Sequence, residues 1–377
     1  MRFPLFCLAA VAGLFHAAAV AATASLQLTL PPACYAVAGV PFSVYYDNVV
    51  LTETPENFRF EFTSDVGQAE ARRWTVTPTD RDVGVHPVSI AVKDQQGNVL
   101  EKAGTVLHVV PRQAGSGRAL RLLMVGDSLT NATHYPNEIA RLLSAPGNPR
   151  WTMLGTHKPP SAAPGVAHEG YGGWKWSSFL TMFSPEPDQT TAGPLARKRT
   201  SPFIYPTADG KPNFDLARYL REECNNQPPD VVTFLLGIND CFAANPNDPA
   251  AMDKTIGEVL DHAEKLLQAF QAASPKTVLA VGLTTPPNAR ESGFEANYKG
   301  KYHRWGWKRI QHRLVQQMLQ RFSGREAQNV FLVPTELNLD PVDGYPDNNG
   351  VHPNPAGYQQ IGASFYAWLK WWLARQP

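Results

Sequence analysis

The chain has 377 residues, of which 43% are hydrophobic and 18% are charged, with 34 Lys and Arg against 33 Asp and Glu. This length predicts two or three domains, and the hydrophobic fraction excludes an intrinsically disordered chain. A formal net charge of +1 gives no overall electrostatic reason to expect a nucleic acid as partner. The 33 prolines exceed the usual proportion of about 5% and indicate many turns and loops.

The N-terminal segment is typical of an export signal. Arg2 supplies a short positive region, residues 5–20 are apolar, and small residues suited to a signal peptidase follow them. We therefore expect a signal peptide at residues 1–24 and a secreted or periplasmic mature protein. The apolar run is short for a membrane span, which needs about 20 residues, and no later run is long and apolar enough. The sequence thus predicts no membrane span in the mature protein.

Residues 25–111 have the pattern of an all-β accessory domain. Short alternating or β-branched runs are separated by Pro, Gly, Asn and Asp, and the QQGN stretch at 95–98 predicts a hairpin turn. This pattern predicts a small β-sandwich, which we expect either to pack on its neighbour or to bind sugar. Residues 112–119 lack a periodic apolar signal and are predicted to be a linker. The expected strands are 26–30, 42–46, 58–62, 74–78, 86–92 and 104–110.

From residue 120 to residue 377 the pattern alternates between strands and helices. The fold class is therefore α/β, with a doubly wound, five-stranded, mainly parallel sheet and helices on both faces. In such sheets the ligand crevice lies beyond the carboxyl ends of the strands. The expected strands are 120–125, 151–154, 231–236, 277–282 and 330–333, and the expected helices are 136–143, 214–223, 251–272, 302–322 and 355–374.

Two of these strands run directly into polar side chains. The strand at 120–125 is followed by Gly-Asp-Ser-Leu-Thr, so Ser128 lies on a turn that faces the crevice, which suits a nucleophile. The strand at 231–236 is followed by Gly-Ile-Asn-Asp, where the amide of Asn239 can stabilise an oxyanion. Each residue alone is also compatible with a simple turn or helix cap.

Two further segments supply a glycine-rich loop and a histidine. In HEGYGGW, glycines let backbone N–H groups approach a ligand, so Gly173, with Gly172 as the adjacent alternative, can donate to an oxyanion. His352 lies in NGVHPN before the last predicted helix, and the proline after it favours an extended loop. A histidine in a loop at this point does not fit the periodicity of a core residue.

Together these four segments resemble the SGNH (GDSL-like) hydrolase family. Ser128 in GDSL, Gly173 in EGYGGW, Asn239 in GIND and His352 in VHPN occur in the family's order. The resemblance implies an esterase in which Ser128 attacks the acyl carbonyl and His352 accepts its proton. It also implies that the backbone N–H groups of Ser128 and Gly173 and the amide of Asn239 bind the oxyanion. No cofactor is expected, because acyl transfer needs only a nucleophile, a base and oxyanion donors.

The third catalytic residue departs from the family pattern. The family places Asp three residues before the histidine, whereas this chain has Asn349. An amide oxygen can fix the imidazole tautomer, but it adds no negative charge to stabilise the imidazolium ion. Asp347, Asp343 or a backbone carbonyl are the alternatives, and Asn349 is placed ahead of Asp347.

Motifs of three other protein classes are absent from the sequence. It has no Gly-x-Ser-x-Gly elbow of an α/β-hydrolase, no His-Glu-x-x-His of a zinc protease and no Walker loop of a nucleotide-binding protein. Cys34, Cys224 and Cys241, which remain after the predicted signal, allow at most one internal disulfide and lack the spacing of a zinc site. We therefore expect no metal site.

The predicted export favours an extracellular ester as substrate. Tyr171 and Trp174 in the glycine loop are expected to bind substrate, because aromatic faces suit sugar rings. Residues 184–212, rich in Pro and Thr, are predicted to be a surface insertion that shapes the site. The expected function is a secreted serine esterase that deacetylates a carbohydrate or cleaves another small ester. The alternatives are an exported O-acyltransferase with the same residues and an inactive carbohydrate-binding or scaffold protein.

Overall fold

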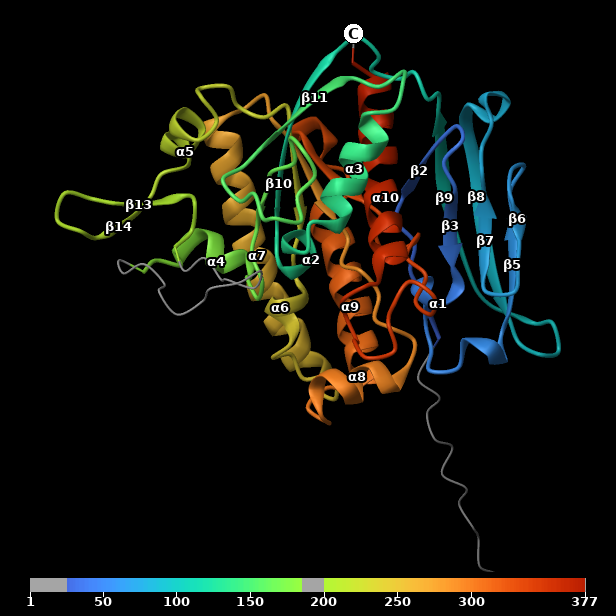
Figure 1. Ribbon diagram of the computed structural model, residues 1–377. Helices are drawn as coiled ribbons and strands as arrows, with labels where there is room; N and C mark the ends of the chain where they lie inside the picture. The colour runs from blue at the N-terminus through green and yellow to red at the C-terminus, as the bar shows by residue number, and fades with distance from the viewer. Residues whose placement is uncertain (1–25, 185–199, 377) are drawn as a thin grey trace, which may run out of the picture.

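The computed structural model describes residues 26–184 and 200–376. The predicted signal peptide and residues 185–199 of the predicted insertion lie outside the described residues. The chain forms an N-terminal part made of small β-sheets and a larger α/β part, and the two lie side by side (Figure 1).

A parallel sheet forms the centre of the α/β part. It consists of β10 (Ala119–Gly126), β11 (Arg150–Leu154), β12 (Glu169–Gly170), β15 (Val231–Leu235), β16 (Val278–Gly282) and β17 (Val330–Val333). The strand order is β11-β10-β15-β16-β17, all neighbours are parallel, and β12 pairs with the end of β10. From β10 the chain adds β11 on one side and then β15 on the other, so a switch point lies between β10 and β15. Ligands bind at such a point, beyond the carboxyl ends of the strands.

Helices cover this sheet and connect its strands. They are α2 (Ser128–Asn131), α3 (His134–Leu143), α4 (Trp176–Thr181), α5 (Leu216–Glu222), α6 (Ile238–Cys241), α7 (Pro249–Ala273), α8 (Glu291–Tyr298), α9 (Arg304–Phe322) and α10 (Pro355–Ala374). Helix α3 packs against α10, whereas α7 packs against α4, α5 and α9. Both α7 and α10 begin with proline, and the side chains of Asp248 and Asn354 accept hydrogen bonds from the first turns. The predicted doubly wound α/β fold is confirmed.

The N-terminal part contains three small β-sheets, with two, three and four strands. Its strands are β1 (Gln27–Leu28), β2 (Ala33–Val37), β3 (Phe42–Tyr45), β4 (Val50–Leu51), β5 (Arg59–Thr63), β6 (Gln68–Ala69), β7 (Arg73–Val76), β8 (Gly84–Lys93) and β9 (Val99–Val110), with the short helix α1 (Tyr46–Val49). The four-stranded sheet has the order β2-β9-β8-β5, the three-stranded sheet has the order β3-β7-β6, and β1 pairs with β4. Neighbours are antiparallel, except that β2 runs parallel to β9. The Asp94 side chain accepts from the Asn98 backbone in the turn between β8 and β9, which confirms the predicted hairpin.

The four-stranded and three-stranded sheets enclose a buried core, as in a β-sandwich. Trp74 of the three-stranded sheet and Ile90 and Leu107 of the four-stranded sheet belong to it. Leu337 also belongs to this core and is 1% exposed, although it comes from the α/β part. Full burial of one leucine contributes about 1.5–3 kcal/mol, so this residue ties the two parts together. The outer face of β2 and β9 packs against α10, which lies between the sandwich and the parallel sheet (Figure 1).

The predicted elements differ from the structure in a few places. Helix α10 coincides with its predicted range, but β2 and α8 were not predicted, and the strand predicted at 26–30 is reduced to β1. The sequence of β2, ACYAV, has no alternation, because the strand is buried between the sandwich core and α10. Sequence alternation can identify only a strand that has one solvated face.

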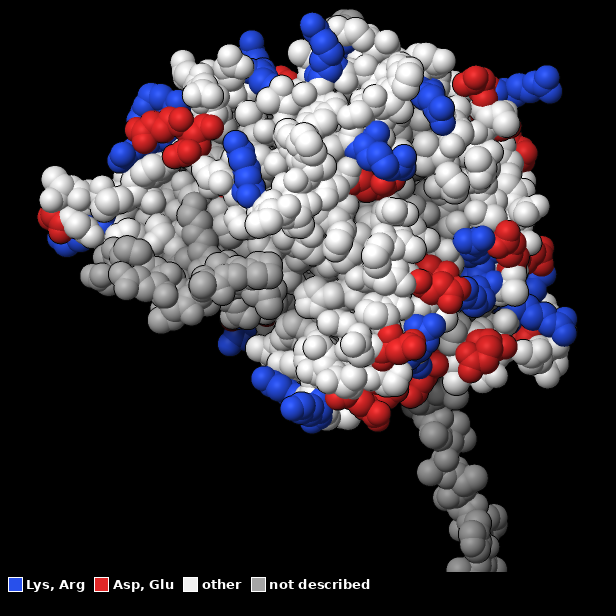
Figure 2. Space-filling view, in the orientation of Figure 1, with Lys and Arg blue, Asp and Glu red and all other residues white. Residues whose placement is uncertain are grey.

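The state of the cysteines, the search for membrane-spanning helices and the search for metal-binding clusters concern the described residues only. Cys34, Cys224 and Cys241 are buried and free. No described helix is long and apolar enough to cross a bilayer, and no described group of three or more His, Cys, Asp or Glu side chains could hold a metal ion. Figure 2 shows Lys and Arg interspersed with Asp and Glu around the rim of the visible face, with a largely uncharged area between them.

Candidate active site

Ser128 lies where β10 meets the short helix α2. Asp127 caps this helix, because its Oδ1 accepts a hydrogen bond from the backbone N–H of Leu129 at 3.0 Å. A Cβ at position 126 would lie only 1.9 Å from Oγ1 of Thr130, so the close approach of strand and helix requires Gly126. The turn leaves Ser128 partly exposed, whereas its neighbours on both sides are buried.

His352 reaches Ser128 from the loop before α10. Its Nε2 lies 2.8 Å from Oγ of Ser128, and its Nδ1 lies 3.2 Å from Oδ1 of Asn349. The amide oxygen can only accept, so Nδ1 carries the ring proton and Nε2 accepts from the serine hydroxyl. Burial lowers the pKa of His352 below its ordinary value of 6.5, which keeps the ring neutral near pH 7. The pair has the geometry needed to pass the serine proton to the histidine.

Asn349 is the side chain that contacts the far ring nitrogen of His352. Its Oδ1 also accepts from two backbone N–H groups of its own loop, at 3.1 and 2.9 Å, so the amide is held in one orientation. Asp347 is directed elsewhere, because its side chain is 87% exposed and pairs with Arg290 at 3.4 Å. Asp343 is also exposed and pairs with arginine. Of the predicted alternatives, the structure brings only Asn349 to the imidazole.

Asn288 holds the segment that carries Asn349 and His352, and the sequence analysis did not identify it. This residue is fully buried, and its Nδ2 donates to the carbonyl oxygens of Pro346 and Asn349 at 2.9 and 3.0 Å. Its backbone N–H donates to the carbonyl oxygen of Gly350 at 2.9 Å. The sequence feature that could have indicated Asn288 is its position shortly after the carboxyl end of β16, because ligand sites form at that edge of a parallel sheet.

Asn239 follows β15, the strand next to β10, in the short helix α6. Its Nδ2 donates to the carbonyl oxygen of Trp174 at 3.0 Å and approaches Oδ2 of Asp127 at 3.4 Å. These partners are the chain neighbours of Gly173 and Ser128. The structure therefore brings Asn239 to the glycine loop and to the turn that holds the serine.

The glycine loop follows β12 at the same edge of the sheet. The backbone N–H of Tyr171 donates to the carbonyl oxygen of Gly126 at 3.1 Å, which ties the loop to the end of β10. Gly173 is exposed and has a φ of 79°, in the left-handed region that favours glycine. The loop is thus held at one end while its Gly173 backbone stays accessible.

The predicted contact of Tyr171 and Trp174 with substrate is wrong. Their side chains are 1% and 2% exposed, and their rings pack together with centroids 4.5 Å apart. The Tyr171 hydroxyl donates to the buried carboxylate of Glu169, which also accepts from the Tyr219 hydroxyl at 2.8 Å and from the Thr156 backbone N–H at 2.6 Å. These aromatic residues support the glycine loop from inside the core, so they are not available to stack on a ligand.

Two buried carboxyl groups adjoin Asn239: Asp127, whose Oδ2 lies 3.4 Å from the Asn239 amide nitrogen, and Asp240, the next residue in the chain. Asp127 and Asp240 are 1% and 6% exposed. Burial raises the pKa of Asp127 to about 7. The hydrogen bond from the Leu129 backbone lowers this pKa, whereas the charge of Asp240 raises it further. Burial likewise raises the pKa of Asp240 to about 7, although its hydrogen bond from the Trp176 backbone opposes the rise. Both groups therefore titrate near neutral pH.

Asn131 places an amide beside the glycine loop, and the sequence analysis did not identify it as a site residue. It lies three residues after Ser128 in α2, and its Oδ1 accepts from Nε2 of His157 at 2.9 Å. The amide nitrogen of Asn131 therefore points away from this contact. It lies 4.0 Å from the position that a Cβ on Gly172 would take, and so beside the glycine loop. Within the described residues, this amide nitrogen has no hydrogen-bond acceptor, so it can donate to a ligand.

Comparisons with known proteins place the chain in a family. Residues 124–360 match the GDSL-like Lipase/Acylhydrolase family, whereas no curated protein matches the chain. Among solved structures, a Clostridium thermocellum family 3 carbohydrate esterase is 17% identical, with 66% of this chain and 94% of that chain covered and a TM-score of 0.39. A family 3 carbohydrate esterase from Talaromyces cellulolyticus is 16% identical, with 68% and 100% covered and a TM-score of 0.40. An acetyl xylan esterase is 14% identical, with 66% and 100% covered and a TM-score of 0.35.

The family match includes Ser128, Gly173, Asn239 and His352, the four residues of the sequence resemblance, and covers more than half of the chain. The chain therefore belongs to the GDSL-like lipase/acylhydrolase family.

Proposed function

We propose that this protein is an exported serine esterase that removes acetyl or other small acyl groups from a carbohydrate. Membership of a lipase and acylhydrolase family supports ester hydrolysis as the reaction class. The observation that carries the proposal is the 2.8 Å separation of Ser128 Oγ from His352 Nε2, with Asn349 on the other ring nitrogen. This chain of contacts activates a serine hydroxyl without any cofactor.

In the first half of the reaction, Oγ of Ser128 attacks the ester carbonyl carbon while its proton passes to Nε2 of His352. The carbonyl oxygen becomes an oxyanion, which the backbone N–H groups of Ser128 and Gly173 and the Asn239 amide stabilise. When the tetrahedral intermediate collapses, the bond from the carbonyl carbon to the alcohol oxygen breaks. The imidazolium ion gives its proton to that oxygen, the alcohol leaves, and the acyl group remains on Ser128.

In the second half, His352 removes a proton from water, and the resulting nucleophile attacks the acyl-serine carbonyl. Collapse returns the proton to Oγ of Ser128 and releases the carboxylic acid. Throughout both halves, Asn349 holds the Nδ1–H so that Nε2 always faces the reacting atoms. Because its oxygen is neutral, Asn349 orients the ring but stabilises the imidazolium ion less than a carboxylate would.

The proposed alcohol portion of the substrate is a sugar. Asn131 offers an amide donor beside Ser128 and the glycine loop, and its orientation is set by His157. Such a donor suits a leaving group that carries hydroxyl oxygens. Export through the predicted signal peptide at 1–24 would bring the enzyme to extracellular glycans, and N-terminal sequencing of the mature protein tests this part.

The experiment that tests the function measures acetate release from acetylated oligosaccharides and, in parallel, cleavage of long-chain acyl esters. We expect acetate release by the wild-type protein and none by Ser128→Ala, with the thermal unfolding midpoint unchanged. Preference for long-chain esters would overturn the substrate class. Transfer of the acetyl group to an added sugar acceptor, instead of to water, would identify an O-acyltransferase. Binding of the glycan without any turnover would identify an inactive binding protein.

A further inference from the structure

We infer that the N-terminal β-sandwich positions the catalytic histidine, because it holds the loop that carries His352. This inference rests on the proposed Ser128–His352 chemistry. The loop, here called the histidine loop, comprises residues 334–354 between β17 and α10 and contains no helix or strand. Such a segment needs contacts from other parts of the chain to keep a catalytic side chain in place.

The first part of the histidine loop is built into the sandwich. Leu337 lies in the sandwich core, and its carbonyl oxygen accepts from the backbone N–H of Tyr45 at 3.2 Å. Oδ1 of Asn338 accepts from the backbone N–H of Ser43 at 2.8 Å. The loop therefore continues the edge of β3, and its backbone is fixed by the N-terminal part.

Asn48 makes a buried polar link between the two parts. It lies in α1 and is 7% exposed, and its Nδ2 donates to the carbonyl oxygens of Glu336 and Leu339, both at 2.8 Å. A third carbonyl oxygen, that of Leu337, lies at 3.3 Å. One amide nitrogen of the sandwich thus contacts three backbone carbonyl oxygens within residues 336–339 of the loop.

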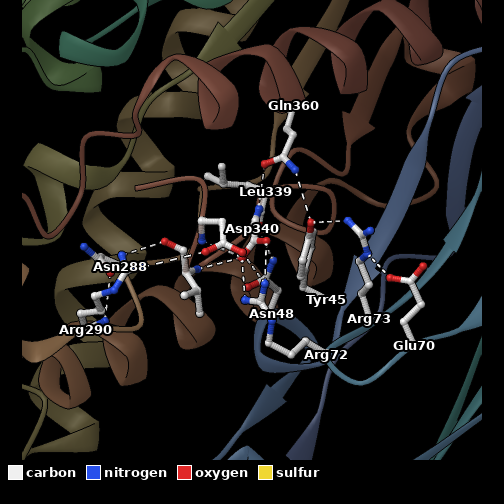
Figure 3. A network of polar contacts seen from close by, with 12 residues as sticks. Tyr45, Asn48, Glu70, Arg72, Arg73, Asn288, Arg290, Leu339, Asp340 and Gln360 are labelled. Atoms are coloured by element: carbon white, nitrogen blue, oxygen red, sulfur yellow. Dashed lines mark hydrogen bonds and ion pairs between the residues drawn. The ribbon is translucent and has the colours of Figure 1, made fainter. Parts of the chain in front are cut away.

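Arg72 makes the second link, just before β7. Its guanidinium donates to both carboxylate oxygens of Asp340, at 3.1 and 3.3 Å, and to Asp343 at 2.6 Å. Oδ1 of Asp340 in turn accepts from the backbone N–H groups of Val342 and Asp343 at 2.9 and 3.1 Å. Figure 3 shows Arg72 and Asn48 on one side of Leu339 and Asp340, with Asn288 and Arg290 of the α/β part on the other.

The contacts continue from this clamped segment to the histidine. The carbonyl oxygen of Asp343 accepts from Nδ2 of Asn354 at 2.8 Å, and Asn354 caps α10 two residues after His352. On the opposite side, Arg290 donates to the carbonyl oxygen of Val342 at 2.8 Å. These contacts connect residues 340–343 to both Asn354 and Arg290. Displacement of residues 340–343 would therefore shift the imidazole of His352 relative to Ser128.

The test uses Arg72→Met and Asn48→Ala in the full chain, with Lys93→Met as the matched control. Lys93 pairs with Glu61 between β8 and β5, so the control also removes an ion pair of the sandwich but touches no part of the histidine loop. The readouts are kcat and KM for a small acetate ester, the rate at which an organophosphorus ester labels Ser128, and the thermal unfolding midpoint. A purely structural role would change the midpoint alone.

We expect kcat and the labelling rate to fall about 3- to 10-fold in Arg72→Met and about 10-fold or more in Asn48→Ala, with KM within about twofold. Lys93→Met should retain wild-type kcat. If Asn48→Ala does not fold, Arg72→Met decides the question. Wild-type kcat and labelling in the folded variants would overturn the inference while leaving the proposed function intact. Full activity of Ser128→Ala would instead overturn the proposed function.

Discussion

Two substitutions of Asn349 can distinguish its effect on the orientation of the His352 imidazole from the effect of a negative charge at the same position. Asn349→Ala removes the acceptor 3.2 Å from Nδ1 of His352. A buried donor left without a partner costs about 1–3 kcal/mol, which corresponds to a loss in kcat of roughly 5- to 150-fold. Asp347→Ala should change kcat by less than about twofold, because Asp347 is exposed and surface ion pairs contribute about 0–1 kcal/mol.

Asn349→Asp keeps the acceptor geometry and adds one negative charge. At about 4 Å and an effective dielectric constant of about 20, a unit charge stabilises the imidazolium ion by about 4 kcal/mol at most. The added charge therefore raises the pKa of His352 from its lowered value. We expect the acid limb of the kcat/KM profile to move to higher pH, and kcat above that limb to equal or exceed the wild-type value.

The assay measures kcat/KM for a small acetate ester from pH 4 to pH 9, together with the thermal unfolding midpoint of each variant. The midpoint shows whether loss of the two backbone contacts of Asn349 unfolds its loop, separately from the effect on the imidazole. A larger loss of kcat in Asp347→Ala than in Asn349→Ala would refute this assignment. An unmoved acid limb in Asn349→Asp would show that its carboxylate does not contact Nδ1.

Three more predictions concern the pH dependence and the oxyanion donors. In the wild type, the acid limb of kcat/KM should lie at a pH below the ordinary histidine value of 6.5, because burial lowers the pKa of His352 and only the protonated ring cannot accept the serine proton. Asp127→Asn, which removes the neighbouring group of pKa about 7, should leave that limb in place. Asn239→Ala should lower kcat about 10²- to 10³-fold with little change in KM, measured in steady-state kinetics. Gly173→Ala should lower both kcat and the free energy of unfolding, the latter by about 1–2 kcal/mol in urea titrations, because its φ is 79°.

The site residues that could be predicted were those that follow strands. Ser128 and Asn239 come directly after β10 and β15, and parallel strands bring their carboxyl ends to one edge whatever else the chain does. Their order along the chain, together with the glycine loop and VHPN, was enough to indicate the family. The contact between His352 and Ser128 was predicted as a consequence of that resemblance, and its distance came only from the fold.

The failures came from residues whose role depends on orientation. Tyr171 and Trp174 were expected to face substrate, but composition cannot tell a ring that faces a crevice from one that supports the loop behind it. Asn349 and Asp347 are two residues apart, and sequence spacing alone could not decide which of them contacts the imidazole. Asn288 carried no motif, since a buried amide that binds backbone carbonyls is recognisable only when its partners are known.

The amino-acid sequence by itself indicated the hydrolase family, the five main strands of the parallel sheet and the serine, histidine and oxyanion residues that we propose for the site. It could do so because these features depend on local periodicity and on short motifs. Only the tertiary structure decided which amide orients His352, and that Asn48 and Arg72 of the sandwich hold the loop around it. The contacts of Asn48 and Arg72 with the loop join residues 288 and 268 positions apart, and no local pattern records a pairing that exists only after the two parts of the chain have packed together.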